Sequence, residues 1–196
     1  MSSEELLNKT KAKDTSITTK YAKSCGAILS IEGLVNRNVV EFKAFLTDFS
    51  QTFASTWNSE DVFGRMDPVA TFRSTKRTIS LAWNVPAEDI EESKRNKTKV
   101  SILTKMLYPK YTAPSDGKVS VKGAQYHTQT MATPPLVKIK YANLIRDAGG
   151  GRTAKDFPDG LMGYIDNLSV KPELEMCYFT GNGDLYPKVW SLSLNF

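Results

Sequence analysis

Four stretches of this sequence carry apolar residues at every second position, and this period of two constrains the fold more than any other feature. Successive side chains of a β-strand point to opposite faces, so the alternation is typical of strands with one buried face. The buried faces expected from it are Val40, Phe42, Ala44 and Leu46; Ile79, Leu81, Trp83 and Val85; Val137, Ile139 and Tyr141; and Trp190, Leu192, Leu194 and Phe196. A weaker stretch covers residues 161–170. The sequence therefore predicts a mainly β fold.

A helical pattern interrupts the strands after Pro86, which cannot donate a hydrogen bond within a sheet. Acidic residues come first and basic residues later, as the helix dipole favours. The apolar stripe consists of Val100, Leu103, Met106 and Leu107. We expect one long flanking α-helix near 87–107, with a solvated, charged first half and a second half packed on a sheet.

The rest of the chain lacks a regular period. Residues 50–75, 110–134 and 146–160 are expected to be loops, and loops of this length usually mark function or partner contact. Residues 1–25 are rich in Lys, Ser and Thr, which indicates a flexible or partner-bound N-terminal arm. Residues 26–196 are long enough for a single β domain with one filled core. The Asn182-Gly183 pair is a strong signal for a tight hairpin turn.

Charge, apolar runs and the first residues argue against a dedicated nucleic-acid binder, a membrane-spanning protein and an exported protein. The chain of 196 residues has 26 Lys and Arg against 21 Asp and Glu, a net charge of +5, without the dense basic clusters of a dedicated nucleic-acid binder. No apolar run approaches the ~20 residues that span a bilayer. The first residues lack the features of a signal peptide. We therefore expect no membrane association and no export.

Catalytic residue types are scarce. Cys25 and Cys177 are the only cysteines and His127 is the only histidine, which is too few for an ordinary zinc site. The adjacent acids in 88–92 lie on a helix expected to be solvated, where no shielded carboxyl is available for acid–base work. We expect no enzyme activity, no catalytic residue, no cofactor and no metal. A hydrolase working through His127 and a carboxylate is the remaining enzyme hypothesis.

Aromatic and basic residues are interleaved between Phe49 and Trp83. Arg65, Arg73, Lys76 and Arg77 stand among the aromatics, an arrangement that can stack and hold single-stranded nucleic acid. Acids in the same segment offer ion pairs within the protein instead. A nucleic-acid-binding β-domain using residues 57–77 is therefore an alternative function.

The stretch from Trp57 to Phe72 resembles a segment of the tail-tube and baseplate-tube proteins of contractile-tailed bacteriophages. The shared pattern is an aromatic residue and Asn, an acid, Phe-Gly-Arg-x-Asp-Pro, and then an aromatic residue with a nearby Arg. Further similar patches follow in the same order at 105–111, 134–135, 161–166 and 183–188. The resemblance covers residues 40–196 in patches and is to tube-initiator-like structural proteins.

This resemblance implies a β-sandwich or barrel of the phage tail-tube type. It implies a structural subunit that forms a six-fold ring with its own copies around the channel for DNA and the tape measure protein. Its partners would be neighbouring tail-tube proteins, baseplate hub or wedge proteins and the tape measure protein, with DNA only in transit. The location would be the tail or baseplate of the virion, assembled in the host cytoplasm.

A ring predicts two sets of site residues. The candidates for contacts between subunits are Trp57, Arg65, Asp67, Arg73 and Arg77. The channel is expected to be lined by paired strands at 136–145 and 161–170, because closure into a barrel removes exposed edges. The candidates on that wall are Lys138, Lys140, Asp166 and Asn167, with Asp166 included if Gly163 marks a β-bulge.

Overall fold

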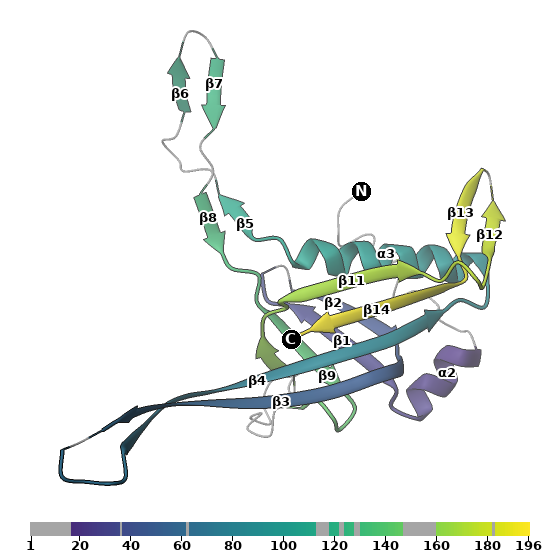
Figure 1. The fold of residues 1–196 in the computed structure, drawn as a ribbon. Helices are drawn as coiled ribbons and strands as arrows, with labels where there is room; N and C mark the ends of the chain where they lie inside the picture. The colour runs from purple at the N-terminus through teal and green to yellow at the C-terminus, as the bar shows by residue number, and fades with distance from the viewer. Residues whose placement is uncertain are drawn as a thin grey trace.

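The structure is a computed structural model that describes residues 17–35, 37–61, 63–112, 118–121, 124–127, 130–146, 160–181 and 183–196. The fold is mainly β, as predicted, and its main body contains two antiparallel sheets (Figure 1). Sheet A has the order β10 (Leu161–Gly163), β9 (Val137–Tyr141), β1 (Ile28–Gly33) and β2 (Asn38–Lys43). Sheet B has the order β11 (Asn167–Pro172), β14 (Val189–Asn195), β4 (Val69–Pro86) and β3 (Phe45–Glu60).

Three smaller pairings and two helices complete the described elements. β5 (Lys110–Thr112) pairs with β8 (Thr130–Thr133), β6 (Lys118–Val121) with β7 (Ala124–His127), and β12 (Tyr178–Gly181) with β13 (Asp184–Pro187). The helices are α2 (Ile17–Ser24) and α3 (Ile90–Met106). In the β12–β13 hairpin Gly181 pairs with Asp184 and Gly183 has φ of +84°, which confirms the predicted tight turn.

The inner faces of both sheets contribute to one hydrophobic core. The alternate residues predicted for the inner faces of these strands are buried there: Ile79, Leu81, Trp83 and Val85 of β4, Val137, Ile139 and Tyr141 of β9, and Leu192 and Leu194 of β14. Phe42 of sheet A and Trp83 of sheet B touch across this core, with ring centroids 6.1 Å apart. Trp190 and Phe196 pack against it while remaining partly exposed.

The first predicted strand is split between the two sheets. Val40 and Phe42 lie in β2, whereas Leu46 lies in β3, and the chain crosses from sheet A to sheet B at the buried Ala44. The predicted face is correct because both sheets cover the same core. The continuous strand is wrong, because a period of two does not show where a chain changes sheets.

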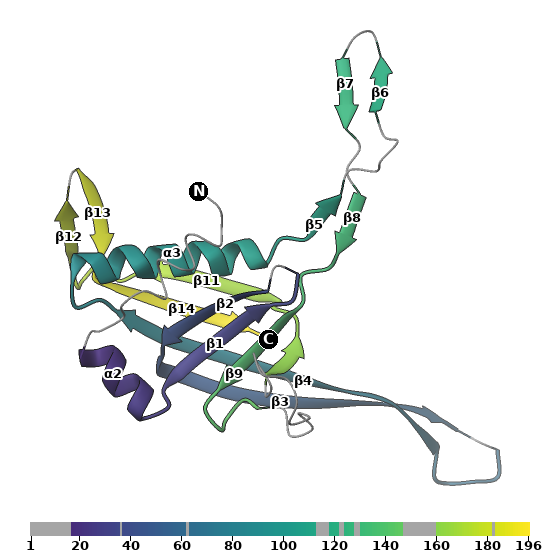
Figure 2. The ribbon, with the colours of Figure 1, turned by 180° about the vertical axis from the view of Figure 1, so that it is seen from behind.

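Helix α3 runs beside β2 and β11 along one side of the two sheets (Figure 2). Asp89 caps its first turn, since the Asp89 carboxylate accepts a hydrogen bond of 2.7 Å from the backbone N–H of Ile90. Val100, Leu103 and Met106 are buried, as predicted. The fully solvated first half is wrong, because polar residues of that half are buried against other elements, as described below.

The expectation of a single helix is also wrong. Residues 17–24 of the expected arm form α2, which buries the small side chains of Thr19 and Ala22. Ile17 and Tyr21 of the same helix are exposed. Because α2 packs through small residues, it has no apolar stripe to reveal it in the sequence. Residues 1–16 lie outside the described part of the chain.

The loop expected at 50–75 is wrong, since β3 and β4 form one long two-stranded ribbon. Their pairing continues from Phe45 and Asn84 to Glu60 and Val69. The far half of this ribbon projects beyond the body (Figure 1). Both of its faces are exposed there, so no apolar alternation marks the strands. The segment 110–134 likewise contains β5 to β8, and most of 146–160 lies outside the described residues.

The ring of Phe196 lies against Gly163, the residue at which the chain leaves sheet A. After Gly163 the chain crosses to sheet B, where β11 begins at Asn167, so the predicted bulge at Gly163 is a change of sheet. A Cβ atom on Gly163 would lie 2.6 Å from Cζ of Phe196. The Phe196 ring therefore uses the space that a side chain at position 163 would fill.

Gly163→Ala tests this contact. We expect it to lower the free energy of unfolding by about 1–3 kcal/mol, because a methyl group would be forced into a filled site. In a Phe196→Ala background the same substitution should cause no further loss. Urea denaturation of the four proteins measures both effects. Equal losses in the two backgrounds would contradict the contact.

Candidate assembly interface

Sheet B presents an outward face of mostly small polar side chains, which we call the polar face. Its members fill three successive rows across all four strands, opposite the buried residues of the same strands. They are Lys171, Ser191, Asn84 and Phe45; Ser169, Ser193, Ala82 and Asp48; and Asn167, Asn195, Ser80 and Ser50. The charges of Lys171 and Asp48 are opposite in sign and lie on the outer strands. The middle strands of the polar face are therefore uncharged.

Both edges of sheet B lack a neighbouring strand among the described residues. β11 pairs with β14 on one side, and β3 pairs with β4 on one side. In sheet A, by contrast, the edge strand β10 has three residues and β2 is contacted by α2 and α3. Long unpaired edges tend to pair with another chain. Among the described residues, both edge strands of sheet B thus lack a neighbouring strand, and helix α3 runs beside one of them, β11.

The far half of the ribbon, which we call the ribbon stem (residues 50–58 and 70–78), has two unlike faces. Its aromatic face continues the core side of sheet B, since Ile79 faces the core and pairs with Gln51, and Phe53 pairs with Arg77 two positions further along. A register shift between Thr56 and Trp57 then places Trp57 opposite Phe72. The opposite face continues the polar face through Thr52, Ala54, Thr56, Thr78, Lys76 and Ser74.

The aromatic face of the ribbon stem contains a contact between two rings and a contact between an arginine and a ring. Trp57 and Phe72 meet edge to face with centroids 5.1 Å apart. The Arg77 guanidinium lies 5.5 Å from the Phe53 ring centroid and donates a 2.8 Å hydrogen bond to Gln51 Oε1. Phe53, Trp57 and Phe72 are nevertheless more than half exposed. A two-stranded ribbon is marginally stable by itself in water, so this apolar surface is suited to a partner.

The predicted contact residues all lie on the ribbon. Trp57 and Arg77 belong to its aromatic face, and Arg73 sits at the register shift. Arg65 and Asp67 lie in the exposed tip, residues 61 and 63–68, where Gly64 has φ of +90°. Within the described part of the subunit, Arg65 and Arg73 form no ion pair. Contacts across a subunit boundary remain a prediction for these five residues.

The predicted channel residues do not share one wall. Lys138 and Lys140 lie on β9 with their side chains opposite the buried face, on the outer side of sheet A. Asn167 belongs to the polar face of sheet B. Asp166 lies just before β11, and its backbone N–H donates a hydrogen bond to the backbone carbonyl of Asn195. The outer faces of the two sheets point to opposite sides of the body. A single channel can therefore be lined by Lys138 and Lys140 or by the sheet B residues, but not by both.

The end of the body away from the ribbon carries six acidic residues together with Lys94, Lys97 and Lys188, and we call it the acidic end (Figure 1). It consists of the β12–β13 hairpin, the turn before it and the first turn of α3, which meets the hairpin through a 2.6 Å bond from Ser93 Oγ to the Pro187 carbonyl. Its acids are Glu88, Asp89, Glu91, Glu173, Glu175 and Asp184, and its exposed apolar residues are Leu174, Met176 and Leu185.

Several charged groups at the acidic end are engaged locally. The Glu91 carboxylate accepts a 2.9 Å bond from Lys94 and raises the pKa of that lysine. The hydrogen bond from Tyr186 to Asp184 raises the pKa of the tyrosine. Lys188 lies over the ring of Phe179 at 5.4 Å. Glu173 and Glu175 form no ion pair within the described residues, so their charge is available to a partner.

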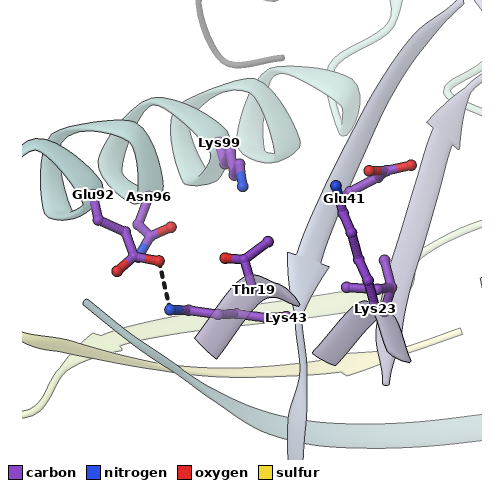
Figure 3. Close-up of a pocket in the computed structure, with 8 residues that line it drawn as sticks. Thr19, Lys23, Glu41, Lys43, Glu92, Asn96 and Lys99 are labelled. Atoms are coloured by element: carbon purple, nitrogen blue, oxygen red, sulfur yellow. Dashed lines mark ion pairs between the residues drawn. The ribbon is translucent and has the colours of Figure 1, made fainter. Parts of the chain in front are cut away.

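A small pocket lies where α2, β2 and α3 meet (Figure 3). Its volume is about 30 Å³. Lys43 and Glu92 form an ion pair of 2.5 Å there, with side chains only 5% and 3% exposed. Lys43 also donates a 2.8 Å hydrogen bond to Thr18 Oγ1, and Glu92 Oε2 accepts one of 2.7 Å from the backbone N–H of Glu88. This pair ties both helices to sheet A.

The buried carboxylate of Glu92 corrects the expectation that the acids at 88–92 are all solvated. Its partner Lys43 is distant in sequence, and pairing is what allows a charge to be buried. No spacing within the helix signals this contact. The arrangement is structural, because the lysine and the backbone of Glu88 occupy the carboxylate oxygens.

The described residues offer little other chemistry. They contain no group of three or more His, Cys, Asp or Glu side chains placed to hold a metal ion. Neither described helix is long and apolar enough to cross a membrane. The side chain of His127, the residue of the hydrolase hypothesis, lies outside the described part of the chain.

The chain matches no protein-family model, and no curated protein matches it.

Proposed function

We propose that this protein is a structural subunit of a phage tail or baseplate tube, a tail-tube-type β-sandwich that forms a ring of like subunits around a channel. The observation that carries the proposal is sheet B, which combines a polar face of balanced charge with two edge strands that have no neighbouring strand among the described residues. The six-fold symmetry and the location in a phage tail are inferred from the sequence resemblance to tube proteins.

The strand directions in sheet B support closure into a ring. Each neighbouring pair, β11 with β14, β14 with β4 and β4 with β3, is antiparallel. The two edge strands β3 and β11 therefore run in opposite directions. When β3 of one copy lies beside β11 of the next, the new pair is also antiparallel, and the pattern continues around the ring without a mismatch. Closure then removes every free edge of sheet B.

The polar face suits the wall of such a channel. DNA binding strength rises with the number of phosphates that lysine and arginine neutralise. The middle strands β4 and β14 present serine, alanine and asparagine in their outward rows, so a passing polyanion meets neither a dense positive charge nor an apolar surface. The polar face thus replaces the wall first expected from Lys138 and Lys140.

Thiol accessibility tests which sheet faces the channel. In a Cys25→Ser/Cys177→Ser background, Ser193→Cys marks the polar face and Lys138→Cys marks the outer side of sheet A. In the assembled protein we expect Ser193→Cys to react at least tenfold more slowly than Lys138→Cys with a polymer-linked maleimide too large for the channel. Both should react alike after dissociation. Equal rates in the assembled ring would contradict the assignment.

The ribbon stem favours a second candidate function, binding of single-stranded nucleic acid. Its charged residues Arg73, Lys76 and Arg77 are all basic, and Arg77 lies on the same face as three exposed aromatic rings, those of Phe53, Trp57 and Phe72. Bases stack on such rings and phosphates bind the basic groups. A labelled oligonucleotide separates the two functions, because nucleic-acid binding would weaken steeply with added salt. A tube subunit should show no saturable binding.

A further inference from the structure

We propose that the aromatic face of the ribbon stem docks on the acidic end of another copy of this chain, in the next ring of a stack. This inference rests on the proposed function. It adds the surface through which one ring meets the next and the residues that make it.

The first step is the direction of the ribbon. β4 leaves the body beyond Ile79, which pairs with the C-terminal Phe196, and continues for residues 69–78. At ~3.3 Å per residue this overhang is about 33 Å long. It follows the strand axis of sheet B, away from the end where β11 finishes and β14 begins (Figures 1 and 2). In a stack of like rings, the overhang therefore points toward the acidic end of a copy in the next ring.

The second step is which face meets that copy. The face of the stem that continues the polar face lies on the channel side when sheet B lines a channel. The aromatic face then lies on the opposite side, where sheet A covers sheet B within the body. Beyond the body, no other described element covers this side. In a stack, the end of the next subunit's body is placed to cover it.

The third step is chemical complementarity. The stem presents exposed Phe53, Trp57 and Phe72 with Arg77, and its charges are all basic. The acidic end presents exposed Leu174, Met176 and Leu185 beside Glu173 and Glu175. Apolar surface thus meets apolar surface, and arginine meets carboxylate. A contact between two different surfaces on like subunits repeats along an axis, which is how a stack grows.

Cys177 provides a test, because it is exposed at the acidic end. In a Cys25→Ser background, Ser55→Cys adds a thiol to the aromatic face of the stem, and Thr56→Cys adds one to the opposite face as the matched control. The purified full chain is assembled, treated with a short flexible bis-maleimide and separated on a denaturing gel. We expect covalent links between copies to be at least tenfold more abundant with Ser55→Cys than with Thr56→Cys.

Charge exchange is the second measurement. Arg77→Glu should lower the fraction of stacked rings in negative-stain images at least tenfold, and adding Glu173→Lys and Glu175→Lys should restore most of it. Equal cross-linking from Ser55→Cys and Thr56→Cys, together with stacking that Arg77→Glu leaves unchanged, would overturn the inference. Rings that never stack would overturn it while leaving the proposed function intact. Absence of any ring would overturn the proposed function itself.

Discussion

Lys43→Met is expected to lower the free energy of unfolding by about 3–5 kcal/mol, because it leaves the Glu92 carboxylate buried without its partner. The pair joins β2 to α3, and Lys43 also holds Thr18 of α2. The double variant Lys43→Met/Glu92→Leu should lose less than Lys43→Met alone, since it removes both buried charges together. Urea denaturation of the two single variants and the double variant gives the coupling.

The exposed pair between Glu91 and Lys94 is the control. Its side chains are 61% and 42% exposed, so Lys94→Met should cost less than about 1 kcal/mol. Equal losses from Lys43→Met and Lys94→Met would show that the buried pair does not hold the helices to the sheet.

Trp83→Ala is expected to cost about 3–5 kcal/mol in the dissociated subunit. Trp83 is fully buried and packs against Phe42 at the centre of the core. Trp57→Ala should cost below about 1 kcal/mol in the same measurement, because Trp57 is 57% exposed and lies outside the core, where it meets the ring of Phe72 edge to face. In the assembled protein we expect Trp57→Ala to reduce the stacking of rings, although it has little effect on the stability of the subunit. Similar stabilities for the two variants would contradict the placement of the ribbon outside the core.

The buried strand faces could be predicted because each strand there has the core on one side and a polar environment on the other. The sequence of β4 shows this difference, since its apolar residues at alternate positions are the buried ones: Ile79, Leu81, Trp83 and Val85. β1 was not predicted, since Ile28 and Leu29 stand side by side and Gly33 ends its inward face without a side chain. The ribbon stem was missed because water surrounds both of its faces, so composition does not alternate.

The candidate site was predicted in part. Sequence resemblance directed attention to Trp57, Arg73 and Arg77, which the structure places on the ribbon stem. The residues predicted for one channel wall lie on two sheets, because Gly163 and Asn167 look continuous in sequence but belong to different sheets. The polar face had a weak signal, the serine and asparagine residues that alternate with the buried residues of β4 and β14. That signal becomes informative only when the strand order brings its rows together.

The most direct test of the central claim is electron cryomicroscopy of the purified assembly at a resolution that shows side chains. We predict a closed ring in which β3 of each subunit lies antiparallel to β11 of its neighbour, and in which Ser80, Ser193 and Asn195 face the channel. A ring with Lys138 and Lys140 of sheet A facing the channel, or particles with no ring, would contradict it.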